Sequence, residues 1–319
     1  MSPIDQLYRH LIPALANVAP ERATELQQLL DKHHITFVFD DKSPDMIFFA
    51  CERDKTITMG LRALERLWAR AFAYISLYEF ITKKHLADPT VLDLDLTGPE
   101  IKPAMDLLAW ALDVERRLRD KNPGDISWPG DLPRPNKHAG KDSLEKAADE
   151  LFLCAIGSVL HHEVGHIERN HDPRSLPQPA SALKPEDDPN FKIATAIRLE
   201  WEKEADAWSA NWLLDEFDES DDRFLKRLLG ISLGFLWEAS RNVYTGCWLR
   251  RHHPPAWDRL YQNVKQHVSD NPYHPIWLFV AYVLQLHLMS IGKQPSIAET
   301  EDPETWVNQL LNHISKSTD

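Results

Sequence analysis

One short stretch of the sequence brings together the side chains that a hydrolytic metal site needs. His162, Glu163 and His166 form an HExxH pattern within the segment LHHEVGHI. In a helix, a spacing of four residues places both imidazoles on one face, one turn apart, where they can reach a single cation. Glu163 lies beside that face, where a carboxylate can accept a proton from a water at the metal. The pattern predicts a zinc site.

The surroundings of this motif favour a buried helix. Four apolar residues flank it, namely Val159, Leu160, Val164 and Ile167. Burying two histidines and a glutamate without a function would cost free energy, which supports a metal site over a surface helix with clustered histidines. No proline interrupts residues 143–169, which we expect to form one helix, with Asp142 and Glu145 as its cap and N3 partner.

A peptidase zinc site needs a third protein ligand and one open position. His171 lies five residues after His166, and Asp172 lies six residues after it. Asp172 has the metzincin offset, but Arg169 stands where that arrangement needs a glycine to turn the chain. Glu202, on the next predicted helix, is the third candidate and the one we prefer.

The helix predicted over residues 198–214 carries a second acid at a useful position. Glu202 and Asp206 are four residues apart and share a face. A neighbouring apolar stripe consists of Trp201, Ala205, Trp208 and Trp212. Glu202 can bind zinc, and Asp206 can accept the outer N–H of a ligand imidazole and so fix its tautomer. The competing interpretation is a solvated acidic helix face.

Together the two predicted helices resemble the gluzincin zinc peptidases. HExxH is followed by ExxAD, from Glu202 to Asp206, and HHPPAWDRL places His253 six residues before Arg259. The last element resembles the HPxxxxR element of the group that includes membrane CAAX prenyl proteases and their heat-shock-induced bacterial relatives. This chain lacks their transmembrane helices and is most similar to the family of the phage-exclusion protease Lit.

The resemblance implies an endopeptidase with one Zn²⁺ per chain, held by His162, His166 and Glu202. Glu163 would take the proton of the attacking water and pass it to the leaving amine. His253 would donate to the oxyanion, with Arg259 in support. The family further implies a protein substrate, the translation elongation factor Tu, cleaved during phage infection, and it allows for an activating partner.

The chain as a whole is expected to adopt a mostly helical α+β, zincin-like fold with a small N-terminal sheet. Short runs of β-branched and aromatic residues predict strands over residues 35–39, 46–51 and 56–59. Apolar periodicity predicts helices over residues 21–33 and 61–82. Zincins align an extended peptide against an edge strand, for which we select Thr56–Met59.

Proline-rich stretches divide the predicted helices. We expect an N-terminal α+β part with the edge-strand sheet over residues 1–121, a proline-rich connection over 122–142 and a helical zinc-ligand part over 143–319, together forming one catalytic unit. A second proline-rich segment, residues 172–190, lies between the two ligand helices and is a candidate lid over the cleft.

Composition excludes several other classes of protein. The formal net charge is −13, and no long basic run suggests a nucleic-acid interface. The three cysteines (Cys51, Cys154 and Cys247) are too few and too far apart for a disulfide framework, which favours the cytoplasm. The longest apolar stretch, Ile276–Ile291, is shorter than the about 20 residues of a membrane span and predicts a buried helix.

Two alternative functions fit the same motifs. One is a non-proteolytic regulatory protein with a structural zinc ion, although such sites normally fill all four positions with protein ligands. The other is a membrane-associated housekeeping metalloprotease that uses Ile276–Ile291 as its anchor.

Overall fold

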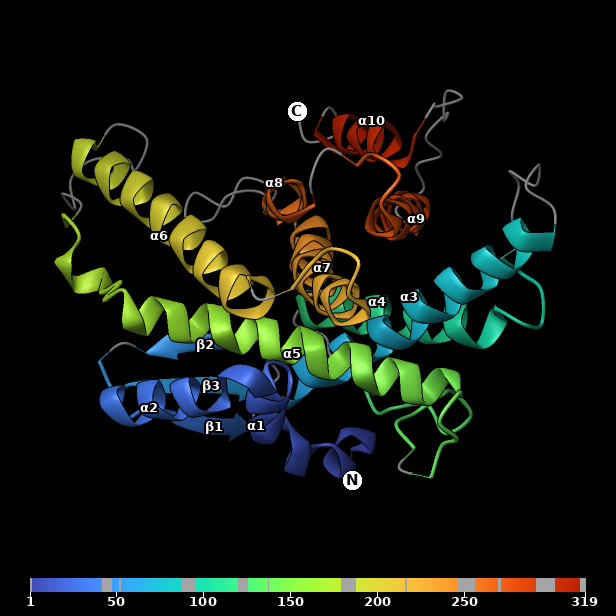
Figure 1. The fold of residues 1–319 in the computed structure, drawn as a ribbon, viewed down its shortest axis with the longest axis horizontal. Coiled ribbons are helices and arrows are strands. Elements are labelled where there is room, and N and C mark those ends of the chain that lie inside the picture. The colour runs from blue at the N-terminus through green and yellow to red at the C-terminus, as the bar shows by residue number, and fades with distance from the viewer. Residues whose placement is uncertain are drawn as a thin grey trace.

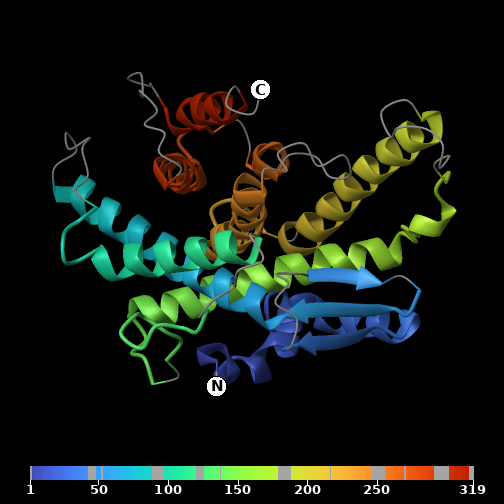
Figure 2. The same ribbon diagram turned by 180° about the vertical axis from the view of Figure 1, so that it is seen from behind.

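The computed structural model describes most of the chain as helices around a long central one (Figures 1 and 2). The described residues are 2–41, 48–51, 53–87, 96–119, 126–136, 138–178, 188–215, 217–245, 256–268, 271–290 and 302–315. Within these ranges the α-helices are α1 (Tyr8–Asn17), α2 (Ala23–His33), α3 (Leu61–Ala87), α4 (Lys102–Arg119), α5 (Leu144–Glu168), α6 (Pro189–Leu214), α7 (Asp222–Thr245), α8 (Ala256–His267), α9 (Pro275–Ser290) and α10 (Pro303–Ser315). Short 3₁₀ helices are η1 (Pro3–Gln6), η2 (Pro20–Arg22) and η3 (Pro173–Ser175).

A small mixed sheet, seen as arrows in Figure 2, lies on one side of the helical body. Its strands are β1 (Thr36–Asp40), β2 (Phe48–Cys51) and β3 (Thr56–Gly60). β3 pairs in parallel with β1 and antiparallel with β2. The mostly helical α+β class and the three predicted strands are confirmed.

The choice of Thr56–Met59 as the edge strand is wrong. β3 lies in the middle of the sheet order β1-β3-β2, so its backbone already pairs with strands on both sides. Ile57 and Met59 are fully buried, as expected for the central strand of a covered sheet. A peptide can add only to an open edge, which leaves β1 and β2 as the candidates.

Helix α5 is the element around which the others pack. It contacts α1, α3, α6, α7 and the sheet. Figure 1 shows it crossing the molecule, with the sheet, α1 and α2 on one side and α6 to α10 on the other. Buried residues occur all round it, so neighbours must cover it on every side. Its cap is Ser143 rather than the predicted Asp142, because the Ser143 hydroxyl accepts the Lys146 N–H at 3.2 Å.

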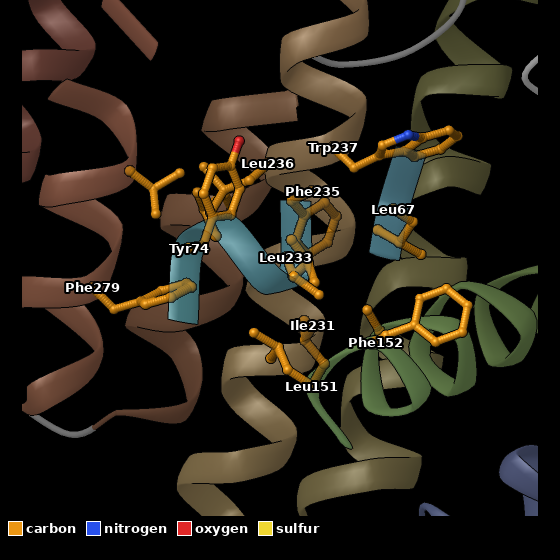
Figure 3. Packing of buried hydrophobic residues seen from close by; sticks show 14 of the residues in the cluster. Leu67, Tyr74, Leu151, Phe152, Ile231, Leu233, Phe235, Leu236, Trp237 and Phe279 are labelled. Carbon is orange, nitrogen blue, oxygen red and sulfur yellow. The ribbon is translucent and has the colours of Figure 1, made fainter. Parts of the chain in front are cut away.

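Apolar side chains from α5 and three other helices pack together in the core (Figure 3). They come from α3 (Leu67 and Tyr74), α5 (Leu151 and Phe152), α7 (Ile231, Leu233, Phe235, Leu236 and Trp237) and α9 (Phe279). The buried hydrophobic cluster includes residues from Ile4 to Ile314, so the described N-terminal and C-terminal parts share one core. The subdivision at residues 122–142 stays a prediction.

The apolar stretch near the C-terminus forms α9, which is buried against α3, α7 and α10. Among the described residues, no helix combines the length and the apolar composition that crossing a bilayer requires.

A close approach of α5 and α7 generates a stability prediction. A Cβ atom added at Gly230 on α7 would lie 2.5 Å from Cβ and 2.8 Å from the backbone carbonyl carbon of Cys154 on α5. Backbone atoms cannot move aside cheaply, so Gly230→Ala should lower the free energy of unfolding by about 1–3 kcal/mol in denaturant titration.

Gly234, one turn further along α7, is the matched control. A Cβ there would make ordinary contact with Val159, at 3.4 Å, so Gly234→Ala should be neutral or gain up to about 1 kcal/mol of helix propensity. Equal unfolding midpoints for the two variants would contradict the proposed helix contact.

Candidate metal centre

Small residues let α5 and α6 approach each other closely where the HExxH motif lies. A Cβ atom at Gly165 would come within 3.2 Å of the Trp208 ring and 3.4 Å of the Ala205 Cα atom. About two turns earlier on α5, the Ser158 carbonyl accepts a hydrogen bond from the Ser209 hydroxyl at 2.9 Å. This contact (α5 and α6 in Figure 1) turns the histidine face of α5 toward the acidic face of α6.

Three side chains converge between the two helices. The Nε2 atoms of His162 and His166 are 3.0 Å apart, and the Glu202 carboxylate oxygens lie 3.5 Å and 3.6 Å from them. One donor atom from each residue lies within 4.8 Å of the other two. Ligands at about 2.0–2.1 Å from a tetrahedral zinc ion are roughly 3.3 Å apart, so the donor set fits such an ion.

The outer nitrogen of His162 lies beside Asp206, the acid proposed to orient one of the two ligand imidazoles. His162 Nδ1 lies 2.9 Å from Asp206 Oδ1, which leaves Nε2 facing the centre. Burial disfavours the charged form of His162, but the hydrogen bonds to Asp206 and Glu202 outweigh burial and raise the pKa to about 10. A proton and a metal compete for Nε2 of such a ring, so metal binding at His162 should depend on pH.

Arg259 on α8 completes this side of the centre. Its Nε and Nη2 atoms donate to the two oxygens of Asp206, each at 2.6 Å, and Nη2 lies 3.5 Å from Glu202. Burial alone would raise the pKa of Asp206, but Arg259 and His162 lower it below its ordinary value. Arg259 therefore holds the carboxylate of Asp206, and its predicted support of His253 stays a prediction, because His253 lies outside the described residues.

The outer nitrogen of His166 has a different partner. His166 Nδ1 lies 2.9 Å from His171 Nδ1, and His171 Nε2 lies 3.0 Å from Glu204 Oε2. Burial, with the charge on His162, lowers the pKa of His166 to about 3, so this ring is neutral at pH 7. No pattern in the sequence indicated the Glu204 contact, although Glu204 lies only two residues after Glu202.

The other predicted site residues lie in different parts of the structure or outside the described residues. Among the described residues, the convergent group leaves out His171 and Asp172, and Asp172 instead caps η3 and pairs with Arg174. Glu163 is half-buried on α5, directly after His162. His253 lies outside the described residues.

Helix α6 begins at Pro189, earlier than the predicted start near Arg198. Asp188 caps it by accepting the Asn190 N–H at 2.8 Å, and Pro189 occupies the first turn, where its missing N–H has no consequence. The pair Asp188-Pro189 was a readable start signal. The last two residues of the predicted lid, Pro189 and Asn190, therefore belong to the helix, while residues 179–187 lie outside the described ranges.

Comparison with known proteins defines the class. Residues 57–280 match the family Peptidase U49, more than half of the chain, and the chain belongs to this family of peptidases. It is 28% identical over 268 residues to the cell death peptidase of Escherichia coli strain K12, an alignment that spans 82% of this chain and 81% of that protein. This relation confirms the resemblance to the Lit family. No solved structure gives a significant match.

The ion pair between Asp206 and Arg259 generates a prediction about stability. Their side chains are 9% and 6% exposed, so Arg259→Ala would leave a buried carboxylate without its cation. This variant should lose about 3–5 kcal/mol of unfolding free energy, measured in the presence of a chelator.

Asp172 and Arg174 provide the matched control, because their pair is equally well formed but 32% and 67% exposed. Arg174→Ala should change the unfolding free energy by less than about 1 kcal/mol. A similar loss in both variants would show that burial does not determine the contribution of the Asp206 pair.

Proposed function

We propose that this peptidase is a zinc-dependent endopeptidase. The observation that carries the proposal is the convergence of His162, His166 and Glu202 at the separations a tetrahedral ion requires. Catalytic zinc sites have three protein ligands and an open position, whereas structural sites have four. Among the described residues, the group contains three ligands, which favours catalysis over a structural zinc.

Each residue of the centre has a role in peptide hydrolysis. When bound, zinc would polarise the peptide carbonyl and make water acidic enough to be deprotonated near neutral pH. Glu163, directly after His162 on α5, accepts the proton of the attacking water and delivers it to the leaving amine. Asp206 orients His162, and Arg259 holds Asp206. By the resemblance to gluzincins, His253 donates to the oxyanion.

An extended substrate segment would bind along β2. Among the described residues, this strand is one of the two edge strands of the sheet, and it is the edge strand that packs against α5, the helix that carries HExxH. In Figure 1, β2 lies between α5 and the rest of the sheet. Strand addition there would place the peptide backbone beside the metal centre, with hydrogen bonds supplied by main-chain groups.

The biological setting is proposed from the relative reported above. The matching protein of Escherichia coli is named a cell death peptidase, and we propose a similar, phage-exclusion role in the cytoplasm. By family resemblance the substrate is elongation factor Tu, and an activating partner triggers its cleavage during infection.

Metal content tests the ligand set directly. The purified protein should contain about one zinc ion per chain, and His162→Ala, His166→Ala and Glu202→Ala should each lose most of it, because three ligands are needed for a stable catalytic site. Glu200→Ala serves as the control, since Glu200 is exposed on the same helix and pairs with Lys203. Full zinc retention by Glu202→Ala, measured by mass spectrometry, would reopen His171 and Asp172 as ligands.

The general base has its own test. Glu163→Gln should keep the zinc and the fold but cleave purified elongation factor Tu at least about 100-fold more slowly, because an amide cannot take the proton of water. Gel-based cleavage assays with any activating factor present measure the rate. Wild-type cleavage by Glu163→Gln would remove the general-base role, and failure of the wild-type protein to cleave would reject this substrate.

A further inference from the structure

We propose that His171 is a positioning residue of the metal centre and that Glu204 sets its tautomer. The inference rests on the proposed function, because it concerns the same metal site. Its basis is a chain of two hydrogen-bond contacts: His166 Nδ1 to His171 Nδ1 at 2.9 Å, then His171 Nε2 to Glu204 Oε2 at 3.0 Å. Neither His171 nor Glu204 belongs to the convergent ligand group.

Only one placement of the ring protons in this chain of contacts is compatible with a metal at His166. A metal at Nε2 of His166 leaves the ring proton on Nδ1, which must donate. His171 Nδ1 must then accept, so the proton of His171 lies on Nε2. That N–H can donate to Glu204, because an ionised carboxylate is an acceptor only. Glu204 therefore selects the His171 tautomer that, in turn, selects the metal-binding tautomer of His166.

The fold supports His171 in this orientation from several sides. Asn170 has a left-handed backbone, with a φ angle of 56°, which ends α5 and turns the chain back. The His171 N–H then donates to the His166 carbonyl at 3.0 Å. The His171 ring is 2% exposed and stacks on Trp201, with ring centres 5.0 Å apart and an interplanar angle of 6°.

The two ligand imidazoles thus have chemically different outer partners. His162 contacts a buried carboxylate, that of Asp206. His166 instead contacts the imidazole of His171, which in turn contacts the carboxylate of Glu204. The Glu204 side chain is 49% exposed and lies on α6, two residues after the ligand Glu202. Helix α6 therefore supports both ligand histidines: Asp206 contacts His162 directly, and Trp201 and Glu204 hold the His171 ring that contacts His166.

A pair of substitutions at His171 separates ring packing from hydrogen bonding. His171→Phe keeps an aromatic ring on Trp201 but removes the acceptor, whereas His171→Asn keeps an acceptor close to the position of Nδ1. We expect His171→Phe to raise the zinc dissociation constant by about 10–100-fold and His171→Asn to stay within about threefold of wild type. Chelator competition measures the constants, and the visible spectrum of the Co²⁺-substituted protein reports the ligand geometry, which should change in His171→Phe alone.

Substitutions at Glu204 test the tautomer without disturbing the core. Lysine donates where glutamate accepts, so Glu204→Lys should reverse the His171 tautomer and weaken zinc binding by about 10-fold or more. Glu204→Gln retains an oxygen acceptor and should bind zinc like wild type. Glu200→Lys introduces the same charge one turn earlier on an exposed site of α6 and controls for repulsion of the cation. These variants also serve if His171→Phe does not fold.

The outcomes distinguish this inference from the proposed function. Wild-type zinc affinity and an unchanged Co²⁺ spectrum in His171→Phe would overturn it and leave the peptidase site intact. An equal loss of zinc affinity in His171→Asn and His171→Phe would also overturn it. So would an equal loss of zinc affinity in Glu204→Lys and Glu200→Lys. A wild-type protein that binds no metal would reject both proposals. The expected affinities in a protein that cleaves no peptide would support the positioning role and reject the proposed function.

Discussion

Asp206 receives hydrogen bonds from two directions, and the geometry of the metal centre depends on that double contact. On one side it accepts from the guanidinium of Arg259, and on the other it lies 2.9 Å from His162. The contact joins α5, α6 and α8 through a single carboxylate. A buried carboxylate is costly without compensation, and here a cation and an imidazole provide it. Because Arg259 fixes both oxygens, the orientation of the His162 ring is fixed as well.

The small residues between α5 and α6 have a comparable importance. Gly165 packs against Ala205 and the Trp208 ring, and a larger side chain there would separate the two helices. Separation would move Glu202 away from both histidines, since each ligand is carried by a rigid helix. The contacts with Asp206 and Glu202 raise the pKa of His162, so the charges on α6 also favour the approach of the imidazole on α5. Helix packing and electrostatics therefore specify the same arrangement.

Local spacing explains which parts of this site could be predicted from sequence. HExxH and the pair Glu202 and Asp206 each lie within one helix, where periodicity alone determines which residues share a face. The position of β3 in the sheet could not be predicted in the same way, because strand order depends on pairing between distant segments. The contact of His171 with Glu204 was missed for the same reason. It requires the packing of α6 against the turn at Asn170, which no local pattern encodes.

The central claim is that α5 and α6 together hold one zinc ion through two imidazoles and one carboxylate. X-ray absorption spectroscopy at the zinc edge of the purified protein tests it most directly. The account predicts a first shell of nitrogen and oxygen alone, at about 2.0–2.2 Å, with the multiple-scattering signature of two imidazoles. A sulfur ligand at about 2.3 Å, a single imidazole, or a protein that retains no zinc would contradict it.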